Sequence, residues 1–323
     1  MKKILSLFLF TFLVMGMFAC GGTTTAAPTT AAPSTEAPTT TVNYVNPTVL
    51  EVQLIPSRDT AVLELQRQPL EDLLAEELDM EVNVTIATDY NALIEAMKSE
   101  QVHVGLLATA SYVLAHDEGA ANVILKSLRY DVDDNGQLLT DQPLVDGYKS
   151  QLVVGADSGI TSVADLEGKT IAIASFTSTS GFVWPANLLA DNGLDVMTDV
   201  TWINAGGHDA AILAVYNGQA DAAFTFKDAR TLVENDYPDV YDEVIFITNT
   251  ESIPNDTISV IPNLDPVLVQ KVKDAFIAIA QTEEGLAIIR AVYNHEGYAV
   301  AVDSEYDIVR TYLERQEDWT FGE

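Results

Sequence analysis

A run of hydroxyl side chains is the segment of this 323-residue sequence best suited to hold an anion. Ser178, Thr179 and Ser180 follow residues 170–174, predicted to form a buried strand, and precede a helix predicted to begin near Gly181. The start of a helix exposes unpaired N–H groups and a partial positive charge, so hydroxyls there can complete a cradle for an oxyanion without Arg or Lys. The alternative is a plain helix N-cap, which needs only one Ser or Thr. The residues alone leave both interpretations open.

A second motif resembles the start of a calcium-binding loop. Asp131, Asp133, Asn135 and Gly136 match the pattern D-x-D-x-N-G, but the position that should carry a bidentate Glu is Gln142. Asp-Asn-Gly is also a strong signal for a tight turn between two strands. We therefore predict a solvated hairpin turn here, and we expect no metal site.

Alternating strand and helix patterns position these motifs. We predict strands at 49–55, 82–87, 102–107, 152–156, 170–174 and 220–226. We predict helices at 65–78, 90–99, 111–116, 210–217, 266–282, 283–292 and 305–315. Pro69 is expected to break or restart the first turn of the first helix. The alternation indicates an α/β protein with a parallel or mixed sheet covered on both faces, as one large domain or two lobes.

The charge balance narrows the possible partners. The chain has 16 Lys and Arg against 48 Asp and Glu, a formal net charge of −32. Such an excess excludes nucleic acid as a partner and disfavours docking of the folded body on anionic lipid. With one Cys and four His, we expect no internal disulfide and no Cys/His zinc site.

The N-terminus has the features of an export signal. Lys2 and Lys3 precede an apolar stretch, residues 4–18, which is too short to span a bilayer. The small residue before Cys20 completes a pattern that resembles a bacterial lipobox. The resemblance implies cleavage of a signal peptide, residues 1–19, and lipid attachment at Cys20. The alternative is an ordinary signal peptide with an incidental Cys.

Residues 20–45 are rich in Thr, Ala and Pro and have no apolar periodicity. Such a segment cannot bury enough surface to offset its ordering entropy, so we predict a flexible tether. We expect an extracytoplasmic protein that meets the membrane through its lipid anchor alone.

Several short segments resemble the substrate-binding proteins of phosphonate, phosphite and phosphate ABC transporters. The matching segments occur in order along the body: 56–59, 89–97, 111–115, 147–150, 165–170, 178–181, 207–210, 218–222, 254–257 and 306–307. The resemblance implies a type II periplasmic-binding-protein fold, with two α/β lobes, a ligand cleft and two hinge crossings. It also implies a small phosphorus oxyanion as ligand, an ABC permease and an ATPase as partners, and no cofactor.

The resemblance also assigns the lobes. Residues 46–150 with 257–323 would form the first lobe, and 151–256 the second. The hinge crossings would lie near 148–152 and 253–259.

Residue roles follow from the matching segments. Ser178, Thr179 and Ser180 would bind the oxyanion, and Tyr90 and Tyr148 would line the cleft. The two tyrosines have an alternative role as core or rim aromatics.

His208 resembles the cleft histidine of the family and would donate to an anion oxygen. Its alternative role is to cap the helix predicted at 210–217, for which Asp209 is the better candidate.

Two acidic positions, Asp228 and Asp256, resemble those that meet the ammonium group in aminophosphonate-binding relatives. A carboxylate beside a dianion is otherwise costly unless it accepts a proton, so we predict that these two form the selectivity filter. Phe182, Trp184 and Phe226 are expected in the core, with an apolar wall of the cleft as the alternative.

The sequence lacks the common catalytic motifs for a nucleophilic Ser, a phosphate-binding loop, a dinucleotide or a zinc protease. We therefore expect no enzyme. Two alternatives remain open: a tethered sensor or adhesin on the same fold, and a tethered hydrolase using the hydroxyl run with His208 as base.

Overall fold

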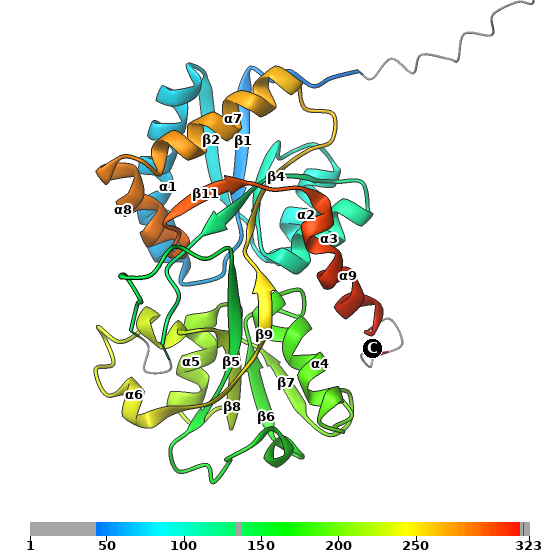
Figure 1. Cartoon of the computed structure of the whole chain (residues 1–323), viewed down its shortest axis with the longest axis vertical. Coiled ribbons are helices and arrows are strands. Elements are labelled where there is room, and N and C mark those ends of the chain that lie inside the picture. Colours follow the sequence, from blue (N-terminus) through cyan, green and yellow to red (C-terminus); the bar gives the residue numbers. More distant parts are fainter. Residues whose placement is uncertain (1–42, 134–136, 317–318, 320–323) are drawn as a thin grey trace, which may run out of the picture. The chain divides into compact units, whose positions relative to one another are not determined.

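Two mixed sheets organise the part of the chain that the structure describes. The computed structural model describes residues 43–133, 137–316 and 319. The predicted signal peptide, Cys20, the tether up to residue 42, and Asn135 and Gly136 of the calcium-like motif lie outside the described residues. Figure 1 shows the two sheets of the folded body with their covering helices.

The first sheet has the strand order β11-β4-β10-β3-β1-β2. Its strands are β1 (Val49–Leu54), β2 (Glu81–Ile86), β3 (Val104–Leu107), β4 (Asn122–Leu128), β10 (Thr257–Val260) and β11 (Gly297–Val300). β1 pairs in parallel with β2 and β3, whereas β10 runs antiparallel between β3 and β4. The last third of the chain therefore returns to complete the sheet that the first third began.

The second sheet has the order β7-β6-β8-β5-β9. Its strands are β5 (Gly147–Gly155), β6 (Thr170–Ile173), β7 (Thr201–Asn204), β8 (Ala222–Phe226) and β9 (Val244–Pro254). β6 pairs in parallel with β7 and β8, and β5 pairs antiparallel with β8 and β9. The chain enters this sheet at β5 and leaves it at β9, where Gly147 pairs with Pro254.

Helices cover both faces of each sheet. They are α1 (Thr60–Leu78), α2 (Tyr90–Lys98), α3 (Thr109–Asp117), α4 (Trp184–Asp191), α5 (His208–Tyr216), α6 (Val240–Glu243), α7 (Pro266–Ile279), α8 (Glu283–Tyr293) and α9 (Asp307–Glu314). In the first lobe α1, α7 and α8 lie on one side of the sheet, and α2 and α3 lie on the other (Figure 1). In the second lobe α5 and α4 take the two faces. This arrangement confirms the two-lobed α/β fold.

Pro69 does not break the first helix, contrary to the prediction. α1 begins at Thr60, where the side chain of Asp59 accepts hydrogen bonds from the N–H groups of Ala61 and Val62, and it continues through Pro69. A proline at this position deprives the carbonyl of Leu65 of its helical partner. Leu65 is 72% exposed, so water can satisfy that carbonyl.

The segment after β4 has the features of the predicted hairpin turn. Val132 and Leu138 form an antiparallel bridge, and the N–H of Asp133 donates to the carbonyl of Gln137 at 2.9 Å. Within the described residues no group of three or more His, Cys, Asp or Glu is arranged to hold a metal ion.

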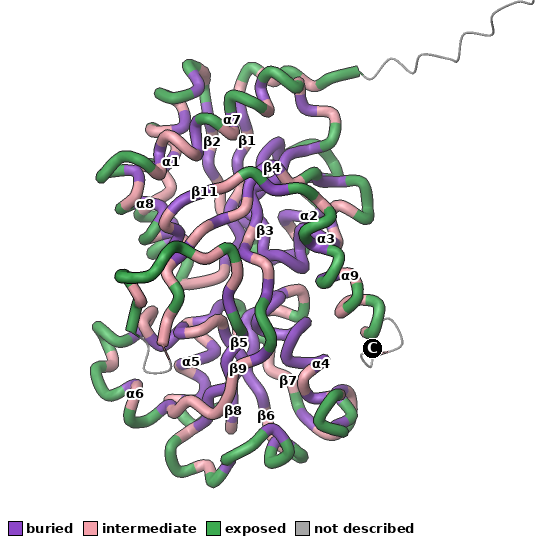
Figure 2. Tube along the Cα trace, viewed as in Figure 1, coloured by how far each residue is buried: buried purple, intermediate pink, exposed green. Residues whose placement is uncertain are grey.

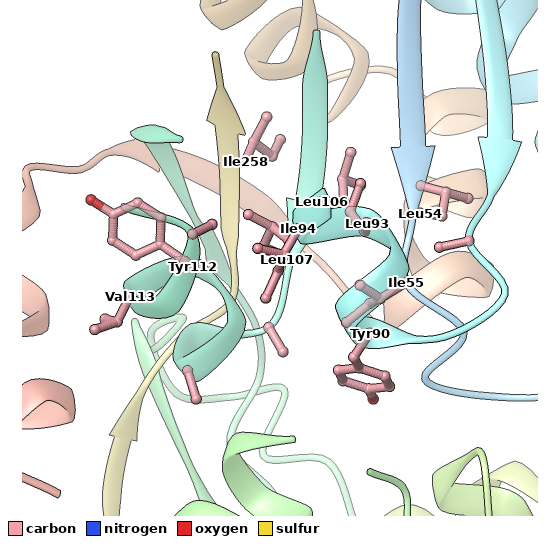
Figure 3. Close-up of a cluster of buried hydrophobic side chains, with 14 of the residues drawn as sticks. Leu54, Ile55, Tyr90, Leu93, Ile94, Leu106, Leu107, Tyr112, Val113 and Ile258 are labelled. Atoms are coloured by element: carbon pink, nitrogen blue, oxygen red, sulfur yellow. The ribbon is translucent and has the colours of Figure 1, made fainter. Parts of the chain in front are cut away.

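The inner strands β3, β6, β8 and β10 are largely buried, whereas the edge strands β7 and β9 are partly exposed (Figure 2). In the first lobe Leu54, Leu93 and Leu106 belong to a cluster of buried side chains, and Tyr90 lies at its edge beside Ile55 (Figure 3). The hydroxyl of Tyr90 points away from the leucines. A packed apolar core thus fixes the backbone from which the polar residues described next emerge.

Candidate ligand-binding pocket

A pocket of about 40 Å³ lies where the ends of strands from both sheets meet. Its walls include Ser57 and Arg58 after β1, Tyr90 after β2, Ser178 and Ser180 after β6, and His208 after β7. Ligands of open α/β sheets bind in the crevice beyond the carboxyl ends of the parallel strands, and this pocket occupies that position in both lobes at once.

Ser178 and Ser180 enter the pocket from the second lobe. A π-helical turn, Thr179–Val183, follows Ser178 and leads into α4. The Ser178 hydroxyl accepts a hydrogen bond from the N–H of Gly181 at 3.1 Å. A Cβ on Gly181 would lie 2.9 Å from that oxygen and 3.2 Å from the nitrogen of Ala174, so only glycine allows this close turn.

Tyr90 and Tyr148 face the serines. Tyr90 is 2% exposed, and burial raises its pKa far above the ordinary value for tyrosine. Burial likewise raises the pKa of Tyr148, although hydrogen bonding with Ser180 and Thr109 opposes the shift. Both phenols therefore remain protonated and can donate to an anion.

Arg129 and Asp256 form the charged side of the pocket. Arg129 Nη2 lies 3.2 Å from Asp256 Oδ2, and its guanidinium carbon lies 4.7 Å from the centre of the Tyr148 ring. The neighbouring Asn255 fixes the crossing segment, because its amide donates to the carbonyls of Ser127 at 2.9 Å and Val145 at 3.1 Å. These bonds tie the backbone that carries Asp256 to Val145, just before the predicted crossing at 148–152.

The pKa of Asp256 is lowered although burial alone would raise it. The opposing interactions come from His295 and Arg129. His295 Nε2 is 4.0 Å from Asp256 Oδ2, which is too far for a direct hydrogen bond. We therefore assign the stabilisation of the carboxylate mainly to Arg129.

His208 is buried at the start of α5. Its Nε2 lies 3.5 Å from the Ser178 hydroxyl, and its ring meets Phe226 edge-on at 5.0 Å. Burial lowers the pKa of His208 to about 4, so the ring is neutral at neutral pH. A neutral imidazole offers an anion one N–H donor without adding charge.

Arg58 stands at the junction of the two lobes. Its Nη1 donates to the carbonyl of Ala291, 2.5 Å away near the end of α8. The carbonyl of the preceding Ser57 accepts the N–H of His208 at 3.0 Å, so the loop after β1 contacts the start of α5 directly. Burial lowers the pKa of Arg58, and the negative charge of Asp209 opposes that effect.

Thr179 and Asp228 are not on the pocket wall. Thr179 Oγ1 accepts a hydrogen bond from the N–H of Ala110 at 2.7 Å. Asp228 is 3% exposed and its Oδ2 lies 2.8 Å from Nη2 of Arg230. Asp228 Oδ1 also accepts from Gln151 at 3.1 Å. Both side chains are engaged by the protein itself.

Of the three aromatic residues expected in the core, two lie in the core and one lines the pocket. Phe182 meets Trp202 edge-on at 5.0 Å, and Trp184 stacks on Tyr312 at 4.2 Å. Both are therefore core residues, whereas Phe226 lines the pocket.

The predicted helix cap was wrong. α5 begins at His208, two residues before the predicted start, and its N-cap is Gly207 with no side-chain hydrogen bond. Asp209 lies inside the first turn, where a carboxylate is favoured by the helix dipole. Burial raises the pKa of Asp209.

Two arginines were missed by the sequence analysis, which expected a cradle without Arg or Lys. Arg58 lay within a segment quoted for the family resemblance, but no role was given to it. Arg129 follows β4, a strand that was not predicted. The sequence signal that could have found both is the scarcity of basic residues, because the chain has only 16 of them.

The comparisons with known proteins agree with this architecture. A family model described as "ABC transporter, phosphonate, periplasmic substrate-binding protein" matches residues 52–306. The chain belongs to this family. Such periplasmic phosphonate-binding proteins are the extracytoplasmic substrate-binding components of ABC transporters. Among the described residues no helix is both long and apolar enough to cross a membrane.

Two curated relatives of the phosphonate-binding family cover most of the chain. The phosphate-import protein PhnD of Mycolicibacterium smegmatis is 26% identical over 284 residues, which is 82% of this chain and 84% of the relative. The phosphonates-binding periplasmic protein of Escherichia coli is 27% identical over 248 residues, 74% of this chain and 69% of the relative.

A solved structure shows the same fold. PhnD1 from Prochlorococcus marinus in complex with methylphosphonate aligns with a TM-score of 0.71 at 18% identity, over 84% of this chain and 98% of that one. This comparison supports the two-lobed architecture alone, because the identity is low.

Proposed function

We propose that this chain captures a small phosphorus oxyanion, namely a phosphonate, phosphite or phosphate, between its lobes and delivers it to an ABC permease driven by an ATPase. The observation that carries the proposal is the convergence of donors from both lobes on one small pocket. Ser178 and Ser180 come from the second lobe, and Tyr90 and Arg129 come from the first. The names of the curated relatives include both phosphate import and phosphonate binding.

The chemistry of the walls suits a tetrahedral oxyanion. Neutral donors from the hydroxyls and His208 bind oxygen atoms, while Arg129 supplies positive charge. Asp256 is the exception, because a carboxylate next to an anion is repelled unless it accepts a proton. We propose that Asp256 accepts the hydrogen of a P–OH group and so disfavours fully ionised anions such as sulfate.

The size of the pocket supports a small phosphorus group. A volume of about 40 Å³ holds roughly three water molecules, if each requires about 10–15 Å³. A phosphate, a phosphite or the phosphoryl end of a phosphonate is of this size.

Hydrogen bonds between the lobes support a closed state that ligand would favour. Besides the bond from Ala110 to Thr179, the hydroxyl of Ser111 donates to the carbonyl of Thr177 at 3.2 Å. A ligand that contacts both lobes binds the closed state better than the open one, and this difference drives closure.

Thr179 and Asp228 keep indirect roles in this proposal. Thr179 would stabilise closure, and Asp228 would shape the wall behind Phe226. We also propose the lipid anchor at Cys20, the tether, and lobes of residues 46–150 with 257–323 and 151–256, as the sequence predicts.

Isothermal titration of the mature chain tests the proposal. The protein would begin at position 20 with Cys20→Ser, and carried-over ligand would be removed by partial unfolding and dialysis. We expect micromolar or tighter binding of at least one of phosphate, phosphite and methylphosphonate, with no heat from sulfate. Folded protein that binds none of them would overturn the proposal.

A further inference from the structure

A second cavity adjoins the pocket. It has a volume of about 420 Å³, against about 40 Å³ for the pocket itself. Four residues line both: Arg58, Arg129, Phe226 and Asn294. A group bound in the pocket would therefore face this second cavity, which we call the outer chamber, across these four side chains.

The outer chamber begins at Phe226. The ring of Phe226 is held edge-on against His208, which lines the pocket but not the chamber. Beyond it, Tyr130 adds a second aromatic side chain and Thr231 adds a small one. Apolar surface next to the phosphoryl pocket suits carbon rather than further oxygen atoms.

Two of the described carboxylates on the chamber wall are paired with arginines. Glu296 accepts hydrogen bonds from Arg290 Nε at 2.8 Å and from Arg290 Nη2 at 2.6 Å. Asp228 is paired with Arg230, as described above.

Glu234, the remaining described carboxylate of the wall, accepts the hydroxyl of Tyr241 at 3.2 Å. Glu234 is exposed, so water already solvates its charge. A cationic substituent would also be repelled by the four basic residues of the same wall, which are Arg58, Arg129, Lys227 and Arg290.

We propose that the outer chamber receives the organic substituent of the ligand, so that the cargo includes phosphonates with an uncharged substituent of several heavy atoms. The inference rests on the proposed function, because it needs the phosphoryl group in the inner pocket. Each methylene that enters the chamber loses contact with water, which favours binding.

A ligand series on the unmodified mature chain tests the proposal. The probes are methylphosphonate, propylphosphonate and 2-aminoethylphosphonate, with phosphate as reference. We expect propylphosphonate to bind within about tenfold of methylphosphonate or more tightly. We expect 2-aminoethylphosphonate to bind more weakly than propylphosphonate, because its ammonium group loses water beside the four basic residues of the wall.

A pair of variants locates the substituent. Thr231 lines the chamber but not the pocket, and its hydroxyl donates to the carbonyl of Asp228 at 2.8 Å. Thr231→Trp fills the chamber and should weaken propylphosphonate by about tenfold or more, while methylphosphonate is much less affected. Thr231→Val loses the same hydrogen bond without filling the space, so it should keep the wild-type order of affinities.

The outcomes separate the two proposals. If propylphosphonate binds the unmodified chain more weakly than methylphosphonate by more than about tenfold, the chamber proposal is overturned and the proposed function stands. If 2-aminoethylphosphonate binds more tightly than propylphosphonate, the proposal that the chamber receives an uncharged substituent is overturned. Binding of no phosphorus compound would overturn the proposed function itself. The ligand series needs no variant, so misfolding of Thr231→Trp would not leave the question open.

Discussion

The hydroxyl of Thr179 accepts a hydrogen bond from the N–H of Ala110, 2.7 Å away in the other lobe. Thr179 is 1% exposed, so this bond lies out of water. The middle residue of the hydroxyl run therefore contacts the first lobe, while its neighbours Ser178 and Ser180 face the pocket. Under the proposed function, one short segment would therefore combine ligand binding with closure.

Thr179→Val should weaken the binding of every phosphorus oxyanion by the same factor. The substitution keeps the shape of the side chain but leaves the Ala110 N–H unpaired when the lobes close, at a cost of about 1–3 kcal/mol. We expect a loss of about tenfold or more by titration calorimetry. Thr177→Val, two residues earlier, is the matched control. A loss that differs strongly between ligands would instead indicate direct contact with Thr179.

Arg129→Met should weaken oxyanion binding about a hundredfold at neutral pH, because it removes charge-assisted donors. It also leaves Asp256 without its positive neighbour, so burial should raise the pKa of that carboxyl. The affinity ratio of variant to wild type should therefore improve as the pH falls, since a protonated Asp256 no longer repels the anion.

The affinities of both proteins are measured from about pH 8 to about pH 5. Because the ligand titrates in the same way in both series, its protonation cancels from the affinity ratio. Arg315→Met, which removes an exposed arginine paired with Asp191, is the control. A constant ratio would contradict the assigned role of Arg129 toward Asp256.

His208 should make stability depend on pH. Its pKa is lowered from 6.5 to about 4 in the folded chain, so between these values the unfolded chain binds a proton that the native chain does not. The free energy of unfolding should therefore fall as the pH drops through this window. The contribution is at most about 3.5 kcal/mol, since each pKa unit corresponds to about 1.4 kcal/mol.

Urea unfolding of wild type and His208→Gln at several pH values measures this contribution. The advantage of wild type over the variant should shrink from about pH 7 to about pH 4. Parallel curves would show that His208 is protonated equally in both states.

Ionic strength should speed the capture of an anion by this protein. The formal net charge of −32 repels phosphate at long range, and salt screens that repulsion. We expect the association rate by stopped flow to rise about twofold or more between about 10 mM and about 200 mM salt. The salt should have a bulky anion that cannot enter the pocket. A falling rate would mean that the cleft arginines dominate the field that the ligand meets.

The parts of the site that could be predicted lie on local patterns. The loop after β2 places Asp89 as the cap of α2 and Tyr90 at its first position, and the predicted start at residue 90 was correct. The hydroxyl run was likewise predicted at a helix start. These features depend on residues only a few positions apart.

The orientation of Thr179 could not be predicted from the run alone. Successive side chains of a helical turn point in well-separated directions, so three consecutive residues cannot all face one small pocket. Which of them faces the ligand depends on the position of the other lobe. The pairing of Asp228 could not be predicted either, because its partner Arg230 is two residues away and faces it only in this turn.

Arg129 and Asp256 depend on pairing between distant segments. β10 inserts between β3 and β4 and carries Asp256 to the pocket, although it lies about 150 residues from β3 along the chain, as the pairing of Thr257 with Leu107 shows. β4, β7, β9, β10 and β11 were not predicted. Most are short, and none can be assigned to a neighbour without knowledge of the whole sheet.

The stack between Trp184 and Tyr312 gives the protein an optical signal of its own. Trp184 belongs to α4 of the second lobe, while Tyr312 lies on α9, which Arg310 ties to Asp117 and Asp303 of the first lobe. Asn187 of α4 also donates to the carbonyl of Tyr312 at 3.1 Å, so α9 bridges the two lobes. Rotation of one lobe against the other should alter the surroundings of this indole, one of three tryptophans in the chain. Its fluorescence emission should therefore follow closure in real time without an added dye.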